Sequence, residues 1–213
     1  MTAMKELPAN PLSINLRFEH ERLWWQIDDE DHMPERWRVS ADVNSVHCAP
    51  EYRHVGDFSL VIADLRQERN LLDADLDDWA MEFIAETLID PAQGLLHPDV
   101  DSRISAGAPR MVIVRHVVLA PRWQGRGLGG ALLAGALRAL AAGARLAVAR
   151  ISPLDFLDSS PDKVSAELAS VRFGALLERI GFEQWREVHF VDLRHPLLFD
   201  ARMTLFEQCD DFI

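Results

Sequence analysis

The sequence predicts an α/β protein built around a mixed sheet, and three observations support this. Three segments in the first half alternate apolar with polar residues, as half-buried strands do, and short connections join them. In the second half, apolar strand-like segments alternate with helical ones. Of the 213 residues, 48% are hydrophobic and 26% charged, which excludes a disordered, collagen-like or coiled-coil chain. We therefore expect one domain over residues 1–213.

The first half is expected to form an antiparallel meander followed by a helix. Strands are predicted at residues 16–27, 37–43 and 54–65. From residue 73 to 89, apolar side chains recur at intervals of three and four, which predicts an amphipathic helix. Residues 91–109 are rich in Gly, Pro and Asp and are expected to form a loop.

The second half is expected to alternate strands with helices. Strands are predicted at residues 111–120, 145–151, 185–193 and 197–206, and helices at residues 128–142 and 164–180. The first of these strands is apolar apart from Arg115 and His116, so we expect it to be central and covered on both faces. Gly181 stands where a left-handed cap ends many helices.

Acidic residues are concentrated in the first half of the chain. Residues 1–110 contain 22 Asp and Glu against 10 Lys and Arg, a net charge of −12, whereas residues 111–213 contain 12 of each. A nucleic-acid backbone needs a basic face, so we expect no nucleic-acid partner. A small-molecule amine or a basic protein segment suits the first half better, although the same charge also favours solubility.

Cysteine usage and hydropathy predict a cytoplasmic protein with no membrane partner. Two cysteines, Cys48 and Cys209, cannot make a disulfide framework or a four-thiolate zinc site. The chain starts without an apolar signal segment, and its longest apolar run, residues 128–137, is too short to span a bilayer. No His-x-x-x-His or Cys-x-x-Cys spacing occurs, so we expect no metal site.

A glycine-rich turn carries the strongest chemical signal. It lies between the predicted strand 111–120 and helix 128–142, with glycines at positions 125, 127, 129 and 130. Glycine lets the backbone approach a ligand closely, and the first amides of a helix have no internal acceptor. Such a turn can therefore seat a diphosphate. The alternative is that these glycines serve only close packing of the helix.

Two familiar phosphate-binding loops fit the turn poorly. A P-loop needs a lysine followed by Ser or Thr after the glycines, and this is absent. The dinucleotide fingerprint Gly-x-Gly-x-x-Gly is present at Gly125, Gly127 and Gly130, and Arg150 could meet the 2′-phosphate in an NADP-dependent oxidoreductase. However, no Asp or Glu lies between residues 110 and 151 to bind a ribose.

The turn instead resembles the acyl-CoA loop of the GNAT acyltransferase superfamily, Arg/Gln-x-x-Gly-x-Gly/Ala, in its residues Gln-Gly-Arg-Gly-Leu-Gly at 124–129. The later Ile180-Gly181-Phe182 helix end is similar to that family's as well. The resemblance covers residues 110–193, an acyl-CoA-binding core, and leaves residues 1–109 as a divergent half. It implies a GNAT-like fold with a mixed, mostly antiparallel central sheet flanked by helices.

The resemblance also implies an N-acetyltransferase activity. Acetyl-CoA or another acyl-CoA would be the donor, an amine of a small molecule or a basic protein segment would be the acceptor, and a homodimer could form through open sheet edges. The backbone of the turn would hold the diphosphate, a strand edge would pair with the pantetheine arm, and one helix residue would touch the cofactor. These implied cofactor-binding residues are Val117, Val118, Leu119, Gln124, Gly125, Arg126, Gly127, Leu128, Gly129, Gly130 and Ser170. Arg122, like Arg126, could add charge beside the phosphates.

The catalytic groups depart from the family pattern. Arg115 stands where many relatives carry a carboxylate base, and Leu177 stands where they carry a tyrosine acid. His116 is the candidate base because imidazoles titrate near neutral pH, but strand alternation turns it to the wrong face unless a bulge intervenes. Water, His189 or a carboxylate from the first half could supply the acid. These departures leave a second function open, a module that binds acyl-CoA without transferring the acyl group.

Overall fold

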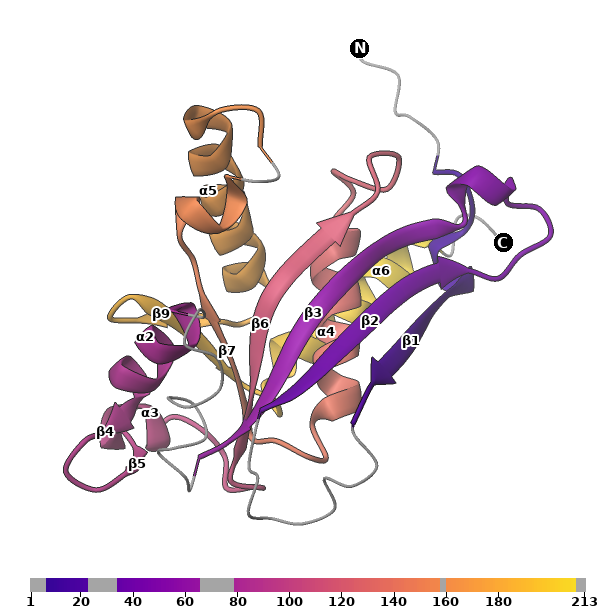
Figure 1. The fold of residues 1–213 in the computed structure, drawn as a ribbon. Helices are drawn as coiled ribbons and strands as arrows, with labels where there is room; N and C mark the ends of the chain where they lie inside the picture. The colour runs from indigo at the N-terminus through magenta and orange to yellow at the C-terminus, as the bar shows by residue number, and fades with distance from the viewer. Residues whose placement is uncertain (1–6, 23–33, 66–78, 158–159, 210–213) are drawn as a thin grey trace.

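The structure is a computed structural model that describes residues 7–22, 34–65, 79–157 and 160–209. Within these residues a seven-stranded sheet occupies the centre, with the strand order β1-β2-β3-β6-β7-β9-β8. Neighbouring strands are antiparallel except β6 and β7, which are parallel. Helices flank the sheet (Figure 1), so the predicted α/β class with a mixed, mostly antiparallel central sheet is confirmed.

The strands of this sheet are β1 (Ile14–His20), β2 (Glu35–Val43), β3 (His54–Asp64), β6 (Arg110–Leu119), β7 (Leu146–Arg150), β8 (Glu183–Trp185) and β9 (Val188–Asp192). A small hairpin pairs β4 (Ile89–Asp90) with β5 (Leu95–Leu96). The helices are α2 (Trp79–Leu88), α3 (Pro98–Asp101), α4 (Leu128–Leu140), α5 (Lys163–Arg179) and α6 (Pro196–Cys209), with 3-10 turns at Pro11–Ser13, Pro50–Tyr52 and Pro153–Phe156.

The predicted antiparallel meander is confirmed as β1, β2 and β3. Its register follows from alternation: Val39, Ala41 and Val43 of β2 are buried, while Arg36 and Arg38, which precede them and face the other way, are exposed. Residues 23–27 of the first predicted strand and residues 73–78 of the predicted helix lie outside the described residues.

Two hydrophobic cores lie on opposite faces of the sheet. On one face, called the α4 face, α4 and α6 pack against the sheet through residues such as Leu133 and Leu198. On the other, the α2 face, α2 and α3 pack through Ile84 and Val100. Figure 1 shows α2 and α3 grouped near β7 and β9 and away from β1 and β2, so the α2 face is covered at one end of the sheet.

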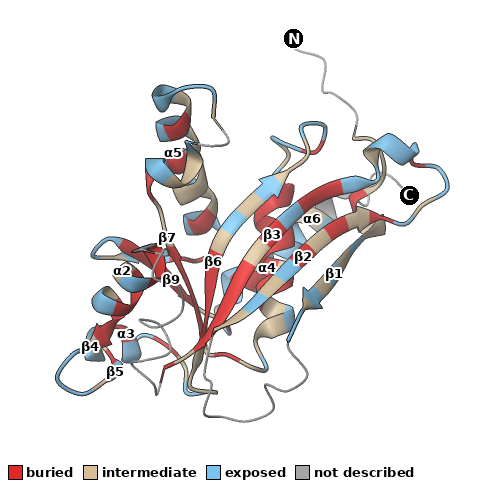
Figure 2. Ribbon diagram, viewed as in Figure 1, coloured by how far each residue is buried: buried red, intermediate tan, exposed pale blue. Residues whose placement is uncertain are grey.

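Strand β6 parts from β7 halfway along its length. The parallel pairing consists of only three residue pairs and ends at Ile113 with Val148. Strand β6 continues to Leu119, and over this part β3 is its one neighbour among the described strands. The expectation that this strand is covered on both faces is therefore correct only for residues 111–114, which are buried, whereas residues 115–119 are half-buried or exposed (Figure 2).

A β-bulge at Arg115 turns the second half of β6 over. On β3, the adjacent residues Ser59 and Leu60 pair with His116 and Val114, so Arg115 is the extra residue. Val114 and, beyond the bulge, Val117 both pack on the α4 face. The bulge therefore places His116 on the α2 face.

Three predicted segments differ from the structure. Residues 197–206 were expected to form a strand but belong to helix α6, which begins at Pro196. His195, just before the helix, accepts a hydrogen bond at its ring Nδ1 from the Leu197 amide at 3.3 Å. The expected strand 185–193 is the β8–β9 hairpin, which turns at Arg186 with a φ of 52°. The expected loop 91–109 contains β5 and α3.

The remaining second-half elements are confirmed. The predicted strand 145–151 and the two predicted helices correspond to β7, α4 and α5. Gly181 has a φ of 98°, and the amides of Gly181 and Phe182 donate to the carbonyls of Glu178 and Leu177, as in a left-handed helix cap. None of the helices that the structure describes has the length and apolar content that a bilayer span requires.

Substituting Gly56 by alanine should destabilise the chain, because a Cβ atom there would lie 2.7 Å from Leu119 Cδ2 and closer still to the Val118 carbonyl oxygen. Forcing β3 and β6 apart at this point should cost about 1–3 kcal/mol of unfolding free energy. The matched control is Gly135→Ala in α4, where a Cβ meets only Leu16 Cδ1 at 3.4 Å and helix propensity favours alanine by up to about 1 kcal/mol. Urea denaturation measures both, and equal midpoints for the two variants would contradict the packing described here.

Candidate functional site

Two side-chain hydrogen bonds hold the start of the glycine-rich turn in place. The Gln124 side-chain amide donates to the Leu119 carbonyl at 2.7 Å, and the buried Trp123 indole donates to the Tyr52 carbonyl at 3.0 Å. Gly125 and Gly127 have φ values of 81° and 76°, and Gly127 is the N-cap of α4. Because a Cβ at either glycine would meet nothing within 4 Å, backbone conformation is what requires glycine there.

The other two glycines of the turn have a different role. A Cβ on Gly129 would lie 3.1 Å from Leu176 Cδ1, and one on Gly130 would lie 3.1 Å from Ile180 Cγ2. These glycines let α5 approach the first turn of α4 closely. The packing interpretation of the motif therefore applies to Gly129 and Gly130, but it does not account for Gly125 or Gly127.

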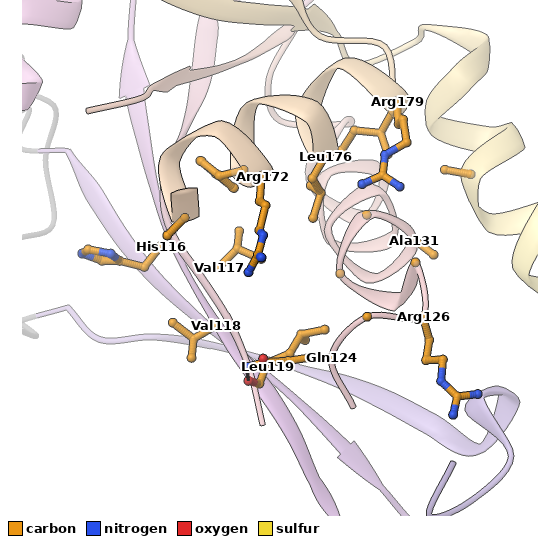
Figure 3. A pocket seen from close by; sticks show the side chains of 18 of the residues that line it. His116, Val117, Val118, Leu119, Gln124, Arg126, Ala131, Arg172, Leu176 and Arg179 are labelled. Carbon is orange, nitrogen blue, oxygen red and sulfur yellow. Dashed lines mark hydrogen bonds between the residues drawn. The ribbon is translucent and has the colours of Figure 1, made fainter. Parts of the chain in front are cut away.

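A cleft of about 1090 Å³ opens beside this turn on the α4 face. The separated half of β6 and the start of α4 form two of its walls, and α5 and the middle of α6 form the others (Figure 3). The predicted site residues that line it are His116, Val117, Val118, Leu119, Gln124, Gly125, Arg126, Gly127, Gly129 and Gly130. The structure thus brings most of the predicted set together around one space.

Two predicted cofactor-binding residues do not line the cleft. Leu128 is buried in the core beneath the turn. Ser170 is also buried, and its hydroxyl donates to the Glu167 carbonyl at 2.8 Å within α5. Of the remaining candidates from the sequence, Arg122 lies with its guanidinium carbon 5.5 Å from the centre of the Tyr52 ring, outside the cleft lining.

Arginines dominate the charge of the cleft. Arg172 and Arg179 extend from α5 into the space above β6 and α4 (Figure 3), joining Arg126 of the turn. Sequence analysis missed both, although their i, i+7 spacing places them on one helix face. Asp155 is the one acidic residue among the described residues that line the cleft, so these walls suit a ligand with several negative charges.

Arg150 lies where β7 ends, at the opening between the two separated strands. Its guanidinium carbon is 5.0 Å from the centre of the Phe83 ring, and its Nη1 is 3.9 Å from Asp155 Oδ2. Burial lowers the pKa of Arg150, with the opposing charge of Asp155 raising it, but a guanidinium remains charged at neutral pH. A fixed positive charge therefore stands at this opening.

The positions considered for proton transfer lie in different surroundings. His116 is exposed and, with Arg115, lines both the cleft and a smaller pocket on the α2 face. Leu177 is fully buried. His189 of β9 is buried outside the cleft lining, and its Nδ1 has no hydrogen-bond partner among the described residues. Those residues contain no group of three or more His, Cys, Asp or Glu arranged to hold a metal ion.

Comparison with solved structures found a crystal structure of AtaTR bound with AcCoA. The TM-score is 0.36 and the sequence identity 14%, over 90% of this chain and 98% of that chain. No protein-family model and no curated protein sequence matches this chain. A likeness this distant supports no statement about activity, which has to be argued from the cleft itself.

The buried His189 should make the protein less stable in acid. Burial lowers the pKa of His189, partly opposed by the negative charge of Glu178. Because the unfolded chain binds this proton near pH 6.5 and the folded chain does not, stability is lost as pH falls below about 6.5.

His189→Leu removes this contribution, and chemical denaturation at pH 7.5 and pH 5.0 measures it. We expect the variant to lose less unfolding free energy than the natural chain over this interval. The control His189→Gln keeps a polar group that does not titrate and should behave like the leucine variant. If both variants lost as much unfolding free energy between pH 7.5 and pH 5.0 as the natural chain does, His189 would not be the origin of the acid sensitivity.

Proposed function

We propose that the chain binds an acyl-CoA, with acetyl-CoA as the first candidate, and transfers its acyl group to an amine. One observation carries this proposal: a strand edge and a set of helix-start amides, both without a backbone partner among the described residues, face the same arginine-lined cleft. The cleft, at about 1090 Å³, lies at the upper end of ordinary ligand sites, which suits a long ligand.

The phosphate end of the coenzyme is assigned to the turn. The first amides of α4 have no acceptor within the helix and stand at its positive dipole end. Gly125 and Gly127 give these amides no Cβ to shield them. Arg126, Arg172 and Arg179 line the same region and would neutralise phosphate charges that the amides leave uncompensated.

The pantetheine arm is assigned to the free edge of β6. From Val114 to Leu119, none of the described strands pairs with this strand on the side that β7 has left. Backbone amide and carbonyl groups on such an edge pair readily with an extended chain that carries amides of its own. We also propose that the coenzyme-binding core, residues 110–193, extends to α6, since Ala201, Thr204 and Leu205 line the cleft.

The acyl transfer is assigned to the part of the β6 edge that lies beside the bulge at Arg115. The coenzyme supplies an activated acyl group as a thioester. The acceptor ammonium gives up one proton, its nitrogen bonds to the acyl carbon as the carbon–sulfur bond breaks, and a second nitrogen proton ends on the sulfur. His116 is proposed as the group that takes the first proton, because the bulge at Arg115 places it at the border between the cleft and the α2 face.

The oxidoreductase alternative has little support in this fold. A dinucleotide site of the usual kind sits in a parallel, doubly wound sheet. Here β6 and β7 are the single parallel pair among the described strands, and the turn follows a strand whose other neighbour is antiparallel. The fingerprint glycines are therefore present without the sheet that uses them.

Calorimetry with acetyl-CoA tests the binding step, and Gly127 provides a matched pair of variants. Gly127→Asn tolerates the left-handed backbone and should bind within a few-fold of the natural chain, whereas Gly127→Val should bind at least about tenfold more weakly. Circular dichroism confirms that both variants are folded. Absence of heat with the natural chain, or equal affinity in the valine variant, would overturn the assignment of the phosphates.

Release of free thiol from acetyl-CoA in the presence of amines tests the transfer step. Thiol release that depends on an amine supports the enzyme. Binding of acetyl-CoA without release on any amine supports the non-catalytic module, for which the buried Leu177 in place of a hydroxyl acid is the favouring observation. If a nicotinamide dinucleotide raised the melting temperature of the protein and CoA did not, the oxidoreductase alternative would replace this proposal.

A further inference from the structure

A second pocket, of about 450 Å³, opens on the α2 face of the sheet. Arg115 and His116 line this pocket and also line the cleft on the opposite face. They stand at the bulge, just beyond the point where β6 leaves β7. An acceptor that enters from the α2 face would therefore reach the reacting end of the cleft at these two residues.

A row of polar residues crosses the sheet toward His116. Glu19 pairs with Arg38, Arg38 pairs with Ser59, and Ser59 pairs with His116, on strands β1, β2, β3 and β6. Residues paired across strands project from the same face. With a strand spacing of about 4.8 Å, the backbone of Arg38 lies roughly 10 Å from that of His116, a distance that their side chains shorten.

Among the described residues that line this pocket, guanidinium groups outnumber carboxylates. Its charged lining residues, apart from His116, are Arg36, Arg38, Arg115, Glu19 and Glu21. The Glu19 carboxylate also forms an ion pair with Arg17, whose Nε lies 3.0 Å from Glu19 Oε1. Arg17 itself does not line the pocket. The described lining thus contains three arginines and two glutamates, although it comes mostly from the acidic half of the chain.

On the basis of the proposed acyl transfer, we propose that the acceptor is a small amine that also carries a carboxylate or a phosphate group. The anion would bind at Arg38 and Arg36, whose planar forks suit both groups. The amine would then lie toward His116. An amine without an anion would make no ion pair with Arg38, so it should bind more weakly.

The test uses thiol release from acetyl-CoA with matched pairs of amines. The probes are the ω-amino carboxylates from glycine to 6-aminohexanoate, 2-aminoethyl phosphate, and the primary amides of the same carboxylates. We expect at least one anionic amine to have a lower KM than its uncharged counterpart. The carboxylate and phosphate members show which anion the pocket prefers.

Arg38→Gln should raise the KM for the preferred anionic amine about tenfold to a hundredfold, as expected for loss of a charged hydrogen bond. Its KM for the amide and its calorimetric affinity for acetyl-CoA should stay within about twofold. Arg38→Lys should recover part of the loss. Arg103→Gln is the matched control, since this exposed arginine pairs with Glu183 and does not line the pocket.

Three outcomes would overturn this inference. The first is that the amides are used as well as, or better than, the anionic amines. The second is that Arg38→Gln changes the KM equally for both members of a pair. The third is that no probe causes thiol release. With either of the first two outcomes, heat with acetyl-CoA shows that the coenzyme site stands although the acceptor assignment does not. With the third outcome, thiol release on an amine outside the probe set shows the same, and no release on any amine favours the non-catalytic module. No heat with acetyl-CoA identifies a failure of the proposed function itself.

Discussion

The parting of β6 from β7 after Ile113 and Val148 is the constraint on which the rest of the structure depends. A strand edge without a partner leaves backbone amides and carbonyls that need hydrogen bonds, and such an edge is normally covered or shortened. Here the chain keeps it open, because the segment after β7 turns away into Pro153–Phe156 and α5. The rings of Phe156 and Phe173 meet edge to face at 6.0 Å and hold that segment against α5. Packing across the opening from β6, between the segment after β7 and α5, therefore keeps the strand edge open.

The four glycines of the turn show how one short motif meets two physical demands. Gly129 and Gly130 bring α5 close to α4 and so fix the width of the cleft above the turn. Gly125 and Gly127 have open space around them and are needed for a backbone that turns left-handed before the helix. Packing alone would explain the first pair and would predict that the second pair could be replaced. The site therefore depends on both interpretations of the motif, each for a different pair of residues.

Much of the fold could be predicted from the sequence, because the elements carry clear periods. Alternation located β2 and β3, and the apolar run with its glycine turn located β6 and α4. The strand prediction at residues 197–206 was wrong, although Leu198, Ala201 and Leu205 have helical spacing and pack on the α4-face core. The bulge at Arg115 could not be predicted, because a strand that is apolar on both faces has no alternation to interrupt. The face of His116 was therefore undetermined until β3 and β6 were seen paired.

The distribution of charge shows a similar limit, because the composition of a segment does not predict which charges line a pocket. The excess of acidic residues in the first half predicts a cationic partner only if it acts as a uniform field, and at physiological ionic strength that field is screened within about 8 Å. Within that distance, the order of residues along each strand decides what a ligand meets. Strand β2 places Arg36 and Arg38 on the same face as His116, whereas Asp57 and Asp42 engage His54 at the other end of the strands. Those two carboxylates raise the pKa of His54, and burial partly opposes them. An acidic half of the chain can thus present a pocket lined by arginines, because register and not composition selects which charges are neighbours.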